Sequence, residues 1–169
     1  SGITNFCVLE MSPGLGGVWS HGGVGGYPGA ACDVPSYTYL PFLDQTGFIP
    51  SKKYVNQSEI ADYANLLADH CEIREHIRFS SKVLSVDYLD AATWQLDIWD
   101  TDKDCPVEPI TAAHIVCANG PLSSPRMPEI PGVESFAGES FHTAKWDYAV
   151  NLKGKRVGVI GTGASAAQV

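Results

Sequence analysis

"KRVGVIGTGASAAQV", residues 155–169, is the stretch that decides the fold. Its apolar run at 157–160 is typical of a short buried strand, and Gly161, Gly163 and Ala166 follow in a GxGxxA pattern. In such a turn the first glycine permits a tight bend, and the second lets the backbone approach a pyrophosphate. The third small residue lets helix and strand pack closely, with the phosphate at the helix N-terminus. Strand, turn and helix start together predict a dinucleotide-binding unit rather than an ordinary tight turn.

Segments upstream of this unit predict further strands and one helix. Strands are expected at 5–9, 76–89, 93–101 and 110–119. "NQSEIADYANLLADHC", residues 56–71, places apolar side chains on one helical face, with Asn56 and Glu59 as a capping box. Four prolines between Gly120 and Gly132 prevent regular structure there, which indicates a connector.

The composition narrows the class of protein. The chain has 169 residues, of which 44% are apolar, enough for one domain with a core. A net charge of −8 and a pI of about 4.9 argue against nucleic acid and anionic membranes as partners. No apolar run reaches the ~18 residues of a membrane span, and no signal peptide is expected. The five cysteines are scattered without a CxxC pattern, which indicates reduced thiols in the cytoplasm and no metal site.

A second nucleotide site is indicated only in part. Glu10 ends the strand expected at 5–9, as an acid that binds a ribose would. Such an acid follows its own glycine motif by about 20 residues, and no such motif precedes Glu10 in the chain. From its position and charge alone, a solvated residue at a strand end is the alternative.

The segment "FAGESFHTAKWD", residues 136–147, carries a specific set of large residues at fixed spacings. It fits the pattern FxGxxxHxxxW followed by Pro or Asp, and it resembles the fingerprint of type I Baeyer–Villiger monooxygenases. The related flavin-containing monooxygenases carry Tyr or Phe, then Lys or Arg, at the last two positions. "LEMSPGLGGVW", "YPGAACDVPSYTY" and "GPLSSPRMPEIPGVESFAG" also resemble that family. The fingerprint residues are Phe136, Gly138, His142, Trp146 and Asp147.

The resemblance implies an α/β flavoprotein with two Rossmann-like, three-layer dinucleotide-binding domains, present here in part. Residues 1–119 would belong to the FAD-binding domain, 120–152 to a connector, and 153–169 to the start of the NADP-binding domain. The chain would then be an internal segment, with the first FAD glycine motif before it and an active-site arginine after it. The fingerprint would form a hinge between the domains. Aromatic side chains that only fill packing space are the alternative for it.

The resemblance also implies roles for individual residues. Glu10 would bind the FAD ribose, and Val83 would contact adenine through its backbone. Asp33 would lie beside the flavin and orient the arginine, whereas from the residues alone an aspartate after a glycine-rich loop caps a turn. The other residues implied in flavin or nicotinamide-nucleotide binding are Gly17, Val18, Trp19, Ala31, Cys32, Tyr39, Thr162, Gly163, Ala164, Ser165, Ala166, Ala167 and Gln168.

The activity implied by the resemblance uses FAD, NADPH and O2 to insert one oxygen atom into a ketone, giving an ester or lactone. An N- or S-oxygenating flavin enzyme, and an inactive segment with at most partial nucleotide binding, are the alternatives. Two departures from the family concern geometry. Seven residues separate Trp19 from Tyr27 where four are usual, so flavin access is expected to differ, and Asn119 replaces a threonine.

Overall fold

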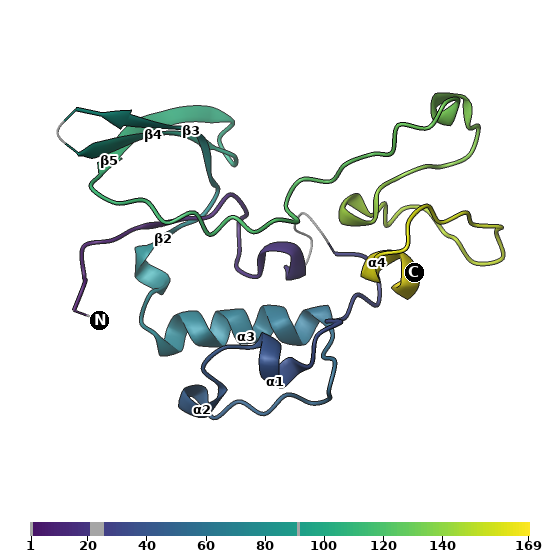
Figure 1. Ribbon diagram of the computed structural model, residues 1–169, viewed down its shortest axis with the longest axis horizontal. Coiled ribbons are helices and arrows are strands. Elements are labelled where there is room, and N and C mark those ends of the chain that lie inside the picture. Colours follow the sequence, from purple (N-terminus) through teal and green to yellow (C-terminus); the bar gives the residue numbers. More distant parts are fainter. Residues whose placement is uncertain (1, 21–25, 91) are drawn as a thin grey trace. The chain divides into compact units, whose positions relative to one another are not determined.

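A computed structural model of the chain describes residues 2–20, 26–90 and 92–169 (Figure 1). The chain divides into two compact units. Unit 1 comprises Ser1–Leu15 and Ala64–Gly120, and unit 2 comprises Gly16–Tyr63 and Pro121–Val169. The division falls within helix α3, Gln57–His70. The unusual loop at 20–26 lies mostly outside the described residues, so its expected effect on flavin access stays a prediction.

Unit 1 contains two small sheets. Strand β1, Val8–Leu9, pairs in parallel with β2, Ile77–Arg78, which accounts for part of the early strand expected at 5–9. Strands β3, Ser81–Leu89, β4, Thr93–Asp100, and β5, Cys105–Ala112, form an antiparallel sheet in the order β3-β4-β5. The central strand buries Leu96 and Ile98 on one face, as its alternating sequence predicts.

The strand expected at 110–119 was placed wrongly. Strand β5 begins at Cys105 and ends at Ala112, and residues 113–119 belong to no strand. Pro106 and Pro109 lie within β5, and proline cannot donate a ladder hydrogen bond, so this segment does not have the sequence of a central strand. The strand tolerates both prolines because it lies at the edge of its sheet.

Helix α3 forms where its periodicity predicts, but it begins differently. Ile60 and Tyr63 are buried on its apolar face. The expected capping box between Asn56 and Glu59 is wrong, because the Glu59 carboxylate accepts hydrogen bonds from the Ser51 N–H at 2.7 Å and from the Ser51 hydroxyl. The long Glu59 side chain thus ties the helix to the preceding loop instead of its own first turn.

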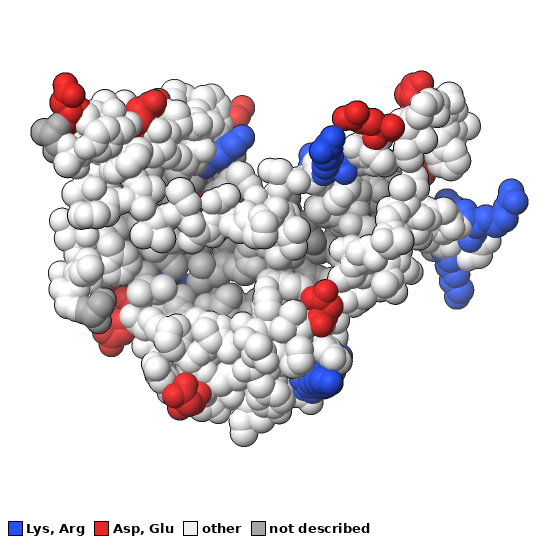
Figure 2. Space-filling model, in the orientation of Figure 1, with Lys and Arg blue, Asp and Glu red and all other residues white. Residues whose placement is uncertain are grey.

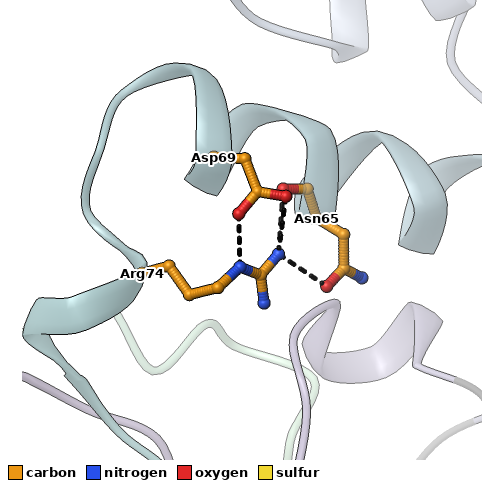
Figure 3. A network of polar contacts seen from close by, with 3 residues as sticks. All are labelled: Asn65, Asp69 and Arg74. Carbon is orange, nitrogen blue, oxygen red and sulfur yellow. Dashed lines mark hydrogen bonds and ion pairs between the residues drawn. The ribbon is translucent and has the colours of Figure 1, made fainter.

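Arg74 forms hydrogen bonds with side chains near the C-terminal end of α3 (Figure 3). It begins a 3-10 turn, Arg74–His76, and its guanidinium donates to both carboxylate oxygens of Asp69. The same Nη2 donates to the backbone carbonyl and the side-chain oxygen of Asn65, both at 3.1 Å. The planar donor fork of arginine suits this arrangement, which fastens the turn after α3 onto the helix.

We expect Asp69→Asn to lower stability slightly and to flatten its dependence on acid pH. The hydrogen bond from Arg74 lowers the pKa of the Asp69 carboxyl below its usual value of 3.8. Stability from a lowered pKa is present above the unfolded-state pKa and is lost as pH falls through the folded-state pKa. Both side chains are well exposed, which keeps the effect small. Melting temperatures of both proteins between pH 2 and 7 measure it, and an undiminished acid dependence in the variant would contradict it.

Unit 2 is built from short helices and loops around one end of α3. Its helices are α1, Ser36–Tyr39, α2, Leu43–Thr46, α4, Ala164–Gln168, and the 3-10 helices Gly17–Trp19, Val133–Ser135 and Thr143–Lys145. Tyr63 from α3 is nearly fully buried, and its ring lies 4.7 Å from that of Phe48. Its hydroxyl donates to the Pro41 carbonyl, so the polar tip of this core residue is satisfied.

The buried strand expected at 157–160 was wrong. Val157, Val159 and Ile160 are exposed, and both described sheets lie in unit 1. An apolar run becomes a strand only where another strand supplies backbone partners, and none does so among the described residues of unit 2. The glycine turn and helix start that should come next are confirmed, because Gly161 has a φ of 125° and α4 begins at Ala164.

Charged side chains are scattered on the face of the molecule that Figure 2 shows. On the face shown in Figure 2, acidic and basic groups stand in small separate clusters with broad uncharged areas between them. Across residues 2–20, 26–90 and 92–169, no helix is both long and apolar enough to cross a membrane.

Candidate functional site

Asp33 lies in a loop that is fixed on both sides. On one side the Cys32 N–H donates to the Val55 carbonyl at 3.0 Å, and on the other the Ser36 N–H donates to the Lys53 carbonyl at 2.7 Å. Asp33 itself is exposed, and it forms no ion pair within the described part of the chain. Backbone hydrogen bonds therefore hold the chain on both sides of Asp33, while its exposed carboxylate is available to a partner.

The buried side chain of Ser36 holds this loop in place through hydrogen bonds. Its side chain is fully buried, and its hydroxyl oxygen accepts from the Val55 N–H at 3.1 Å. The same hydroxyl lies 2.9 Å from the Lys53 carbonyl, to which it donates. One small side chain thus satisfies the buried Val55 N–H and adds a second hydrogen bond to the Lys53 carbonyl.

We expect Ser36→Ala to destabilise the protein by about 1–3 kcal/mol, because the buried Val55 N–H loses its partner. Denaturant unfolding measures the change. Ser135→Ala is the matched control, since the exposed Ser135 hydroxyl donates only to the local Gly132 carbonyl. Equal stability of the two variants would contradict a structural role for Ser36.

Trp19 and Tyr39, both implied in flavin binding, contact one another. The Trp19 indole N–H donates to the Tyr39 hydroxyl at 2.7 Å, and the rings meet edge to face with centroids 6.0 Å apart. Gly17, with a φ of 54°, opens the 3-10 helix that carries Val18 and Trp19. This left-handed conformation favours glycine at the position. The result is a hydrogen-bonded aromatic pair next to a glycine turn, with Tyr39 exposed.

Residues of the fingerprint segment also contact one another. A Cβ on Gly138 would lie 2.7 Å from the Phe136 ring, so a larger residue here would require that exposed ring to move. The His142 Nδ1 accepts from the Ala144 N–H at 3.0 Å and so caps the 3-10 helix Thr143–Lys145. Because Nδ1 accepts, the ring proton of the neutral imidazole is on Nε2.

The end of the fingerprint lies against the loop that leads to Asp33. The Trp146 ring packs edge to face on Phe141, with centroids 5.1 Å apart, and lies 6.4 Å from the Tyr27 ring. Tyr148 donates from its hydroxyl to the Gly26 carbonyl at 2.9 Å. Asp147 makes a local turn, in which its Oδ1 accepts from a backbone N–H two residues on.

The glycine turn reaches the same loop through Gln168. Its side chain, at the end of α4, hydrogen-bonds Tyr27 and both backbone polar groups of Ala31. Gly163 stands at the N-cap position of α4. The rest of the expected phosphate-binding set, Thr162, Ala164, Ser165, Ala166 and Ala167, lies in the turn and in this helix.

Two implied residues lie in unit 1. Glu10 Oε1 accepts from the Ser12 N–H at 2.7 Å, and Oε2 has no protein donor within the described residues. The Glu10 carbonyl accepts from the Ser81 N–H at 2.8 Å, at the start of β3, and Val83 lies two residues further along that strand. Glu10 and the strand that carries Val83, the residue expected to contact adenine, are therefore neighbours within their unit.

Unit 2 thus brings together most of the implied site residues. Those missed from the sequence are Ser36, Tyr27 and Tyr148, which support the site through contacts with distant segments. Tyr27 had a signal, since it opens the "YPGAACD" segment, but its partners are more than 100 residues away. Among the residues that the structure describes, no group of three or more His, Cys, Asp or Glu side chains is placed to hold a metal.

The sequence and the fold both match known proteins. The profile of a family described as flavin-binding monooxygenase-like matches residues 31–169. A polycyclic ketone monooxygenase from Thermothelomyces thermophilus is 36% identical over 100% of the chain and 28% of its own length. A Baeyer-Villiger monooxygenase from Streptomyces coelicolor is 38% identical over 99% of the chain and 30% of its own length. The chain therefore spans less than a third of these relatives.

Solved structures agree with the sequence matches. The structure of the polycyclic ketone monooxygenase superposes with a TM-score of 0.84, at 36% identity, over 99% of the chain and 28% of its own. A structure of OTEMO in complex with FAD and NADP superposes with a TM-score of 0.79, at 35% identity, over 96% of the chain and 31% of its own. The expected fold class, a partial Rossmann-like α/β flavoprotein fold, is confirmed.

Proposed function

Because this chain belongs to the flavin-binding monooxygenase-like family, we propose that the whole protein is a monooxygenase that uses FAD and NADPH. It inserts one oxygen atom of O2 into a ketone and gives an ester or lactone. The observation that carries this proposal is the fingerprint Phe136 to Asp147, which has Trp and Asp at its last two positions. Relatives named Baeyer-Villiger monooxygenase and polycyclic ketone monooxygenase support it.

The residues of the chain fit the two cofactors. Trp19 and Tyr39 offer a hydrogen-bonded aromatic pair to an isoalloxazine ring, and Glu10 keeps one carboxylate oxygen for ribose hydroxyls. The glycine turn at 161–163 and helix α4 would cradle the NADP phosphates. When bound, FAD would accept the hydride from NADPH and activate oxygen. The chain would bind and orient both cofactors, and it exposes the Asp33 carboxylate on a loop held by backbone hydrogen bonds.

The domain assignment belongs to the same proposal. Residues 1–119 belong to the FAD-binding domain, 120–152 to the connector, and 153–169 to the start of the NADP-binding domain. The small-molecule partners are a ketone and O2. A cytoplasmic location fits the five free cysteines.

Product analysis tests the proposal. The whole protein, supplied with NADPH and 18O2, is offered matched ketone, amine and sulfide substrates. Ester or lactone carrying one labelled oxygen is the expected product, and transfer of oxygen only to nitrogen or sulfur would overturn the ketone assignment. Retention of yellow colour through desalting by the isolated 169-residue chain would separately exclude the view that the segment binds no flavin.

A further inference from the structure

Gln168 uses most of its hydrogen-bonding capacity on the protein itself. Its Oε1 accepts from the Tyr27 hydroxyl at 2.6 Å and from the Ala31 N–H at 3.1 Å. Its Nε2 donates to the Ala31 carbonyl at 3.0 Å. A carboxamide is the side chain that offers an acceptor and a donor at the right spacing for both polar groups of one residue. Glutamate lacks the donor, and leucine lacks both groups.

The Ala31 segment is held from its other side as well. Ala31 and Asn56 form an antiparallel bridge, in which the Cys32 N–H donates to Val55 and the Gln57 N–H donates to Ala30. Residues 30–32 are therefore clamped between the start of α3 and the side chain of Gln168. Asp33 comes directly after them, so the clamp restrains the backbone that leads into it.

Tyr27 links the clamp to the fingerprint. It is 6% exposed, and its ring lies 6.4 Å from Trp146 while its hydroxyl is held by Gln168. A single side chain thus contacts the end of the connector fingerprint and the helix after the glycine turn. All of these contacts lie within unit 2.

We propose that Gln168 is a positioning residue that couples occupancy of the glycine turn to the placement of Asp33. A nucleotide that orders α4 also orders the Gln168 amide, and through it Ala31 and the residues after it. The inference rests on the proposed function for its nucleotide, but the clamp itself is independent of catalysis. Gln168 then acts through Ala31 and Tyr27 rather than as a direct cofactor contact.

Amide hydrogen exchange of the whole protein tests the clamp. In Gln168→Leu, exchange in peptides that contain residues 31–33 should rise about tenfold or more, because hydrogen bonds that restrain local opening are lost. Tyr27→Phe should give a smaller rise, since it keeps the ring on Trp146 and both bonds to Ala31. Gln168→Glu should give a rise between wild type and the leucine variant, because a carboxylate can still accept from Tyr27 and from the Ala31 N–H but cannot donate to the Ala31 carbonyl. Gln95→Leu, a matched change on β4, should leave this peptide unchanged.

A second measurement, made with NADP+ but without catalytic turnover, tests the coupling. Saturating NADP+ should slow exchange at 31–33 in the wild type, and Gln168→Leu should abolish most of that protection even when the nucleotide is saturating. Unchanged basal exchange in Gln168→Leu would overturn the clamp. Equal protection by NADP+ in both proteins would overturn the coupling, and weakened NADP+ affinity with normal exchange would make Gln168 a direct cofactor contact instead.

The two proposals fail separately. A wild-type protein that binds no NADP+, or that oxygenates no ketone, would overturn the proposed function. The basal exchange comparison uses neither nucleotide nor substrate, so it decides the clamp in either case.

Discussion

Asp33→Ala in the whole protein should keep FAD bound but slow NADPH-dependent flavin reduction or oxygen transfer by about 10²-fold or more. The physical reason is charge placement. A carboxylate beside the flavin can hold an arginine contributed by the rest of the protein, and a preorganised cation in a dry site stabilises negative charge on the reacting oxygen. Asp33 is exposed and free of cations within the described residues, while its neighbours Cys32 and Ser36 are fixed by backbone hydrogen bonds.

Asp33→Glu separates charge from position. It restores the carboxylate but moves it by one methylene, and a displacement of about 1 Å at such a site can cost 10²-fold in rate. We therefore expect little recovery. Stopped-flow absorbance follows flavin reduction, and the product formed per NADPH follows oxygen transfer. Normal values of both in Asp33→Ala, with FAD retained, would remove Asp33 from the chemistry and leave it as a residue that caps a turn.

The sequence predicted elements whose signal is local. Helix α3 could be predicted from its periodicity. Apolar residues that recur every 3.6 positions form one face of a helix, and that face needs only one apolar surface of the protein to pack against. The glycine turn before α4 could be read because a φ of 125° at Gly161 is a property of that residue itself. Strand β4 could be read because its alternation matches one buried face.

The sequence failed where the outcome depends on a distant partner. The run at 157–160 has the residues of a buried strand, but no described strand of unit 2 lies beside it, so its side chains stay exposed. Glu59 has the spacing of a capping box, yet Ser51 competes successfully for its carboxylate. Pro106 and Pro109 are acceptable only because β5 is an edge strand, which the sequence of that strand does not reveal.

In the candidate site too, the sequence predicted local motifs but not contacts between distant residues. The fingerprint and the glycine turn identified Trp146 and Gln168, but not that both contact Tyr27. The contact from Tyr148 to Gly26 likewise joins residues 122 positions apart. Spacing within a motif carries no information about such pairs, since they depend on how unit 2 folds.

His142→Ala should reduce ketone oxygenation about tenfold while FAD stays bound, because losing a side-chain cap costs on the order of 1 kcal/mol and loosens the residues after the cap. The His142 Nδ1 accepts from the Ala144 N–H and so fixes the short helix Thr143–Lys145. Trp146 comes directly after this helix and packs on Phe141 and near Tyr27. A frayed cap would let the tryptophan shift away from the loop that leads to Asp33.

His142→Asn distinguishes the capping role from a proton donated at Nε2. Asparagine is a good N-cap and replaces the Nδ1 acceptor, but it lacks the ring nitrogen on the far side. Recovery of oxygenation in His142→Asn would show that the histidine acts through the backbone of the connector. Failure to recover, with FAD still bound, would assign the role to the Nε2 proton. Normal oxygenation in His142→Ala would exclude any functional role for the histidine. Loss of FAD together with unfolding would instead show that the fingerprint serves only packing, because a connector that only fills space should lower stability and not turnover alone.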